Sequence, residues 1–281
     1  MEELPVFGIY EKALRKGSFP ELFAQAREAG YGAMELSVDA TDERLARLQW
    51  APEKIDELAA LARREGVQIL TMCLSGHKRF PLGHPDAEVV ERGMRVMQKA
   101  IEFSLRLGIR VIQLSGFDVT DEKLRTHETQ ARYVRNVERA ARMAERACVT
   151  LAIEPVEGNL LDVQSTMRVV SAIDSPFLQV YPDPANILSL GIDPIADLEY
   201  GRGHIAAVHM RESLPGIFDA TVPLGTGNLD FEAVVRKLDE LHFAGPMIVE
   251  MWNETRPEGP ALIAQARNYL EETIRKVRSH V

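Results

Sequence analysis

A short apolar run followed by an amphipathic helical segment recurs eight times along the chain, and this alternation restricts the fold more than any other feature of the sequence. Apolar runs this short, with few polar interruptions, are typical of strands buried on both faces, as in a parallel sheet. The runs lie at residues 5–10, 33–38, 67–74, 109–116, 149–156, 178–183, 205–210 and 246–252.

The segments between the runs carry the signals that begin and end helices. Pro52 opens an amphipathic pattern that stops at Gly66, directly before the third run. Proline fits the first turn of a helix, and glycine can adopt the left-handed conformation that ends one. Gly30 and Gly108 stand in the corresponding place before the second and fourth runs. The sequence therefore predicts strands that alternate with helices.

Eight such units in 281 residues predict a single closed (β/α)₈ TIM barrel of the α/β class, whose usual size is about 250 residues. We predict that residues 1–281 form one domain, because no linker or low-complexity tract interrupts the alternation. An open doubly wound sheet is the alternative, but no GxGxxG motif follows any of the runs. The longest connection, residues 211–245, predicts an active-site loop.

Composition and charge disfavour several classes of function. The chain carries 33 basic and 42 acidic residues, a net charge of −9, which argues against nucleic acid as a partner. No apolar run reaches the 18 residues of a membrane span, and the N-terminus lacks the features of a signal peptide. Cys73 and Cys148 predict packed, reduced thiols. Together these features predict a cytoplasmic protein without a membrane partner.

Ionisable residues lie near the carboxyl ends of the last four apolar runs, where the chemistry of such barrels takes place. They are Glu154, Asp183, His209 and Glu250. One such residue alone is more often an ordinary surface or core residue. Four at one level on successive strands predict a site for one divalent metal ion. Three carboxylates and an imidazole suit Mn²⁺, Co²⁺, Mg²⁺ or Zn²⁺, and the sequence does not select among them.

Longer motifs extend over nearly the whole chain, namely FGIYEKAL, SGHKRFPLG, LAIEPVE, YPDPAN, AAVHMRESLPGIF, VPLGTGNLDF and GPMIVEMWNE. Through them the chain resembles the L-ribulose-5-phosphate 3-epimerase (L-xylulose-5-phosphate 3-epimerase) family, also called hexulose-6-phosphate isomerases, among the xylose isomerase-like barrels. LSGHKRFPLG and IVEMWNE are the motifs that are specific to this family, whereas the barrel pattern alone is not. The resemblance implies that the four strand-end residues are metal ligands. Barrels of this superfamily are often dimers, so a homodimer is compatible with it.

The two glutamates suggest how a ketose phosphate would react. A cation bridging the C2 carbonyl and the C3 hydroxyl would stabilise the enediolate left when the C3 proton is removed. Inversion at C3 requires that a proton return on the opposite face. Because the fifth and eighth strands are not adjacent, Glu154 and Glu250 can flank the substrate from two sides. We predict that they are the acid/base pair and that Asp183 and His209 anchor the metal, a division that the resemblance also implies.

Two loops are candidates for binding the phosphate group. LSGHKRFPLG presents His77, Lys78 and Arg79 between glycines, and such a basic loop suits phosphate oxygens, although exposed loop charges are often merely solvated. We predict that Arg79 contributes more than Lys78, because a guanidinium can bind two oxygens at once. In GTGNLDF, Gly225 and Gly227 precede a helix that begins near Asp230, and the N-terminus of such a helix attracts an anion. Alternatively, Asp230 itself caps the helix, and the loop then only shapes the pocket.

Two positions favour a phosphorylated substrate over a free sugar. The ketose 3-epimerases that act on unphosphorylated sugars generally have a histidine three residues after the metal aspartate and an arginine six after the metal histidine. This chain has Asn186 and Pro215 there. An aldose–ketose isomerase on the same scaffold remains an alternative, as does a non-catalytic sugar-phosphate-binding protein. A DNA-repair nuclease on this scaffold would need more histidines and a less acidic chain.

Overall fold

The computed structural model describes residues 4–156, 158–214 and 219–279. Each predicted apolar run contains one strand, so the strand assignment is confirmed, with ends shorter than the runs. The strands are β1 (Phe7–Tyr10), β2 (Ala33–Ser37), β3 (Gln68–Cys73), β4 (Val111–Ser115), β5 (Thr150–Glu154), β6 (Leu178–Val180), β7 (Val208–Met210) and β8 (Met247–Val249).

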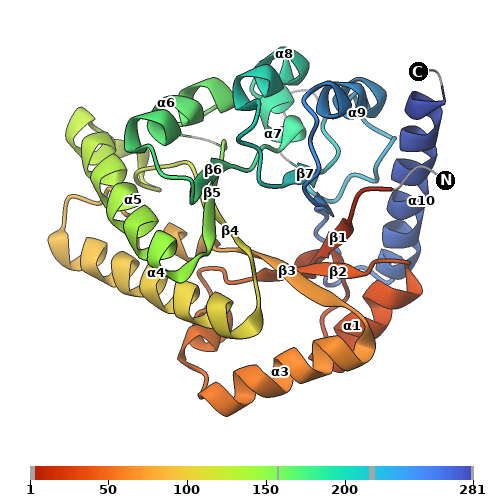
Figure 1. Ribbon diagram of the computed structural model, residues 1–281, viewed down its shortest axis with the longest axis horizontal. Helices are drawn as coiled ribbons and strands as arrows, with labels where there is room; N and C mark the ends of the chain where they lie inside the picture. The colour runs from red at the N-terminus through yellow and green to blue at the C-terminus, as the bar shows by residue number, and fades with distance from the viewer. Residues whose placement is uncertain (1–3, 157, 215–218, 280–281) are drawn as a thin grey trace.

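All strand pairs are parallel, and the sheet runs in the order β6-β5-β4-β3-β2-β1-β8-β7. The strands at the two ends of this order, β6 and β7, are joined by a parallel bridge between Val180 of β6 and Ile205, which precedes β7 in the chain. The Val180 N–H donates to the His204 carbonyl, and the Ala206 N–H donates to the Val180 carbonyl, each at 2.9 Å. The sheet therefore closes on itself, with the helices outside the ring (Figure 1), and the predicted TIM barrel is confirmed.

The helices follow from the sequence signals that predicted them. In α3, Pro52 occupies the first turn, and Ile55 and Leu58 lie on the buried face. Gly66 ends this helix at φ 69°, as Gly108 ends α4 at φ 85°. The helices are α1 (Phe19–Glu28), α2 (Asp42–Leu45), α3 (Pro52–Glu65), α4 (Ala87–Leu107), α5 (His127–Ala147), α6 (Val163–Ile173), α7 (Pro184–Ser189), α8 (Pro194–Leu198), α9 (Phe231–Glu240) and α10 (Gly259–Arg278), joined in places by short 3₁₀ turns.

The two cysteines differ in their surroundings. Cys73 is buried at the end of β3, as predicted, and both thiols are free. The prediction of a packed thiol is wrong for Cys148, which is exposed. It ends α5 in the left-handed conformation, at φ 53°, a place where glycine is more common. Within the described residues, no helix is both long and apolar enough to cross a membrane.

Candidate active site

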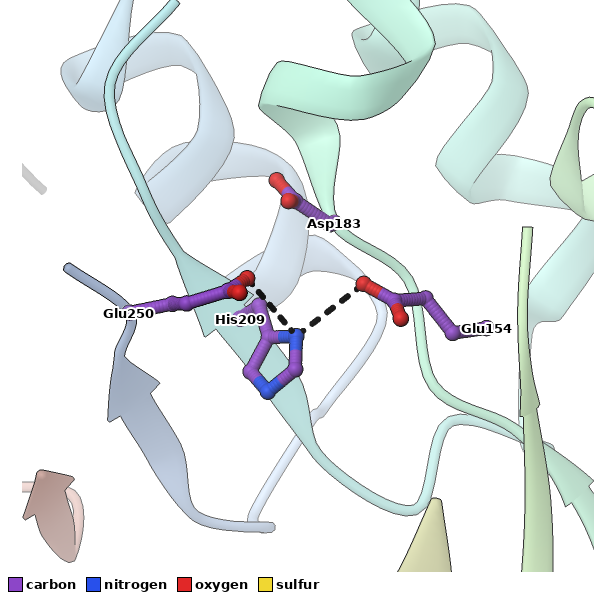
Figure 2. Close-up of side chains that lie close together, drawn as sticks. All are labelled: Glu154, Asp183, His209 and Glu250. Carbon is purple, nitrogen blue, oxygen red and sulfur yellow. Dashed lines mark hydrogen bonds and ion pairs between the residues drawn. The ribbon is translucent and has the colours of Figure 1, made fainter. Parts of the chain in front are cut away.

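The four residues predicted to bind a metal gather at one end of the barrel. Glu154 closes β5, His209 lies within β7, and Glu250 directly follows β8. Asp183 follows β6 and begins α7, where its Oδ1 accepts hydrogen bonds from the first turn of the helix. Each residue offers one ligand atom, and these four atoms lie within 4.8 Å of one another in buried surroundings. Glu154 and Glu250 approach from opposite sides of His209 (Figure 2).

The imidazole of His209 is held between carboxylates on both of its nitrogens. Its Nδ1 lies 3.1 Å from Glu154 Oε1 and 3.3 Å from Glu250 Oε2. Its Nε2 lies 2.7 Å from Oε1 of Glu35, a fully buried residue of β2. Nδ1 is therefore the nitrogen that faces the cluster. Glu35 was not predicted from the sequence, although a single acidic residue inside the apolar run 33–38 indicates a buried carboxylate that needs a partner.

A buried arginine, also missed from sequence, faces the cluster from the other side. Arg211 follows β7, and its Nε donates to Asp183 Oδ2 at 2.8 Å. Its guanidinium also donates to the Asn186 side-chain oxygen, and its Nε lies 3.9 Å from Glu250. The Asn186 amide in turn donates to Glu154 Oε1 at 3.1 Å. Asn186, predicted to be a substrate-binding residue, thus links Arg211 to Glu154.

Burial and the proximity of like charges shift the pKa values of the residues in the cluster. Burial raises the pKa of Glu250 to about 7, with Glu154 and Asp183 adding to the shift and His209 and Arg211 opposing it. Burial alone would lower the pKa of His209, but the surrounding glutamates, led by Glu35, raise it well above its ordinary value. Carboxylates crowded in this way require a compensating positive charge.

The cluster fits a divalent cation by the chemistry of its donors. Three carboxylates and an imidazole nitrogen that faces them form a mixed set of hard and borderline ligands. Because the ligand atoms come from four successive strand ends, the barrel fixes them relative to one another. Two further groups orient the glutamates: Gln113 donates to Glu154 Oε2, and the Trp252 indole donates to Glu250 Oε1 at 3.3 Å.

A cavity of about 670 Å³ adjoins the cluster, within the size range of sites for small molecules. Glu154, Glu250 and Asn186 line it, so the cluster is open to a ligand. Lys12 and Lys78 bring positive charge to the same cavity. Its apolar lining includes Phe117, Leu190 and Trp252. The cavity therefore combines a carboxylate cluster, two cations and apolar walls.

The three basic residues predicted to bind phosphate, His77, Lys78 and Arg79, lie in different surroundings. Lys78 lines the cavity, and within the described part of the chain no carboxylate pairs with its ammonium group. His77 is buried, with Nε2 3.1 Å from the Gly93 carbonyl oxygen, and burial lowers its pKa to about 4. Arg79 forms an ion pair with Asp42 and is about half exposed, at 46%. Of these three residues, only Lys78 lies among those that line the cavity.

The second predicted phosphate loop is organised around a buried carboxylate. The Gly225 N–H donates to Glu212 Oε2 at 2.8 Å, and Glu212 Oε1 accepts from the Leu229 N–H at 3.2 Å. A side chain at Gly227 would collide with Glu212 and the Ser213 carbonyl. Neither glycine lines the cavity. Pro215, the other position that separated phosphorylated from free sugars, lies outside the described residues.

Comparisons with known proteins agree with this architecture. The family model of the xylose isomerase-like TIM barrels matches residues 23–273. The chain is 39% identical over 272 residues to the L-ribulose-5-phosphate 3-epimerase UlaE of Salmonella heidelberg (strain SL476), covering 96% of this chain and 95% of the relative. It is 39% identical over 277 residues to the protein of the same name from Escherichia coli O157:H7 (strain EC4115 / EHEC), covering 98% and 96%.

Solved structures of lower identity share the fold. A structure of an L-ribulose 3-epimerase superposes with a TM-score of 0.80 at 20% identity, covering 99% of this chain and 97% of that one. A D-tagatose 3-epimerase-like protein gives 0.81 at 19% identity, covering 98% of each chain. From the family match and the near full-length identity, the chain belongs to the L-ribulose-5-phosphate 3-epimerase family of the xylose isomerase-like TIM barrels, a family of isomerase-class enzymes.

Proposed function

We propose that this protein is a divalent-cation-dependent epimerase that interconverts L-ribulose 5-phosphate and L-xylulose 5-phosphate by inverting C3. The observation that carries the proposal is the pair Glu154 and Glu250, which approach His209 Nδ1 from opposite sides at 3.1 and 3.3 Å and line one cavity. Inversion needs two proton-transfer groups on opposite faces of the substrate. The names of the two relatives support this choice of substrate.

The two glutamates are proposed to divide the proton transfer between them. One carboxylate removes the C3 proton, and the other delivers a proton to the opposite face. In the metal-free cluster burial raises the pKa of Glu250 to about 7, and the positive charge of a bound cation would oppose this shift. Gln113 and Asn186 hold the Glu154 carboxylate in place by hydrogen bonds to its two oxygens.

Glu154, Asp183, His209 Nδ1 and Glu250 are proposed to hold the divalent cation. When bound, such a cation supplies positive charge that stabilises the enediolate oxygens and makes the C3 proton more acidic. Arg211 keeps Asp183 oriented and offsets part of its charge at 2.8 Å. Replacing a carboxylate ligand should therefore weaken both cation binding and turnover.

The phosphate group is proposed to lie at the Lys78 and Lys12 side of the cavity. Lys78 belongs to the predicted basic loop and has no carboxylate partner in the described part of the chain. The Lys12 ammonium lies 2.7 Å from Asp39, which Arg44 also contacts at 3.0 Å, so Lys12 shares this carboxylate with a second cation. Arg79 would have to leave Asp42 before it could bind phosphate.

Incubation of the purified protein with Mn²⁺ and L-ribulose 5-phosphate in D₂O tests the proposal. We expect L-xylulose 5-phosphate to form with deuterium at C3, detected by NMR. An aldose phosphate as the product, formed by proton transfer between C1 and C2, would instead establish an aldose–ketose isomerase. Saturable binding of the ketose phosphate without any solvent exchange would establish a non-catalytic binding protein.

A further inference from the structure

We propose that Glu35 is a positioning residue that keeps the His209 proton on Nε2, so that the Nδ1 lone pair is directed at the metal-binding cluster. This inference rests on the cation site of the proposed function but concerns a residue outside the ligand set. Glu35 lies on β2, and His209 lies on β7, three strands further around the ring. Glu35 contacts the side of the imidazole that faces away from Glu154 and Glu250.

Three hydrogen bonds fix the Glu35 carboxylate inside the barrel, where it has no exposed surface. Its Oε2 accepts from the Tyr181 hydroxyl at 2.7 Å and from the Thr71 hydroxyl at 2.8 Å. Its Oε1 is left for His209 Nε2, at 2.7 Å. A buried carboxylate needs several such partners to be retained. The arrangement thus presents one oxygen, in one direction, to the imidazole.

The chemistry of imidazole turns this contact into control of the tautomer. A neutral imidazole has one N–H and one lone pair, on different nitrogens. An ionised carboxylate can only accept, so Glu35 favours the tautomer with the proton on Nε2. When a cation displaces the proton from the cluster side, the lone pair lies on Nδ1, which faces Glu154 and Glu250. Tyr181 also packs against the ring, with centroids 4.6 Å apart, so the ring cannot turn freely.

Two nearly isosteric variants separate this hydrogen bond from the charge of Glu35. Glu35→Gln and Glu35→Leu both remove the negative charge, but only glutamine keeps an oxygen that can accept from Nε2. Zn²⁺ affinity of the EDTA-treated, full-length protein would be measured by competition with a chelator. Loss of a group that orients a ligand usually weakens metal binding about 10- to 100-fold. We expect Glu35→Leu to lose affinity in this range and to bind about tenfold more weakly than Glu35→Gln.

Tyr181→Phe is the matched control, because it removes one of the two hydrogen bonds to Glu35 Oε2, leaves the Thr71 hydroxyl on that oxygen, and keeps both the Oε1 contact with His209 and the ring against it. We expect its Zn²⁺ affinity to stay close to that of the wild type. Equal affinities for the leucine, glutamine and wild-type proteins would overturn the role of Glu35. Absence of Zn²⁺ binding to the wild type would instead overturn the cation site itself, and so the two failures are distinguishable.

Nitrogen-15 NMR of the histidines gives a readout that does not depend on the leucine variant folding. In the Zn²⁺-loaded wild type we expect the His209 Nε2 to carry a proton and Nδ1 to show the shift of a metal-bound nitrogen. The Glu35→Gln protein should keep this pattern with a weaker Nε2–H hydrogen bond. A metal-bound Nε2 in the wild type would overturn the proposal.

Discussion

Replacing Glu250 by glutamine should make the metal-free protein more stable at alkaline pH while it abolishes epimerisation. The pKa of Glu250 rises from its ordinary 4.5 to about 7, mainly through burial. A group whose pKa is raised by folding holds its proton more tightly in the folded state. Its contribution to stability is therefore complete below about pH 4.5 and is lost as the pH rises through about 7. The shift corresponds to a loss of about 3 kcal/mol.

Glutamine cannot ionise, so the variant avoids this loss. Urea unfolding of the EDTA-treated proteins at about pH 4 and about pH 8.5 measures this loss, as the difference between the pH dependence of the variant's stability and that of the wild type. Glu35 and Glu154 remain beside His209 in the variant and continue to raise its pKa. We expect the variant to exceed the wild type by about 3 kcal/mol at the higher pH and to differ little from it at the lower.

Divalent cations should reverse this ranking. The wild type offers the Glu250 carboxylate to the ion, so added Mn²⁺ should stabilise it more than the variant. Glu57→Gln, a change at an exposed position of α3, is the control for a general effect of removing charge. An equal decline of stability with pH in the Glu250→Gln and wild-type proteins would refute the argument that ionised Glu250 is held at a cost.

Four further substitutions test other parts of the site and of the barrel. Glu154→Gln should reduce solvent deuterium exchange at C3 by at least about 100-fold, measured by NMR, whereas unchanged exchange would remove Glu154 from the acid/base pair. Lys78→Ala should raise KM for the ketose phosphate about 10- to 100-fold, a loss of about 1.5–3 kcal/mol. Arg79→Ala, made in parallel, should have the smaller effect, because Arg79 pairs with Asp42 and does not line the cavity; a larger effect would instead support the preference for Arg79 predicted from the sequence. Gly83→Ala should destabilise the fold by about 1–3 kcal/mol in urea unfolding, because its Cβ would lie 2.6 Å from the Asp118 and Thr129 carbonyl oxygens; full stability would show that this loop can shift.

The sequence predicted those features that depend on local periodicity or on the closure of the barrel. Buried strands have a characteristic length and composition, and the ring brings their ends to one level, so the gathering of Glu154, Asp183, His209 and Glu250 followed from their places in the chain. The direction of a loop side chain is not set in this way. Arg79 turns to Asp42, which precedes it by 37 residues, and no local pattern indicates that pairing.

Contacts between distant segments were also beyond local patterns. Glu35 and His209 are separated by 174 residues, and only the folded ring places them on facing strands. Glu35 lies on β2, whereas the predicted ligands lie at the carboxyl ends of the last four strands. The role of Arg211 could not be predicted from local patterns for the same reason, because its partners Asp183 and Asn186 precede it by 28 and 25 residues.

The closure between β6 and β7 has a consequence for how the barrel opens. Elsewhere around the ring, neighbouring strands share a ladder of residue pairs. Between β6 and β7, one bridge joins Val180 to Ile205, and the His209 N–H donates to the Pro182 carbonyl at 3.0 Å in addition to the two backbone hydrogen bonds of Val180. Asp183 follows β6 on one side of this seam, and His209 lies in β7 on the other. A cation bound by both residues would link the two segments across this shorter strand contact. Amide hydrogens near Val180 should then exchange with solvent quickly in the metal-free protein and slow markedly once the ion is bound.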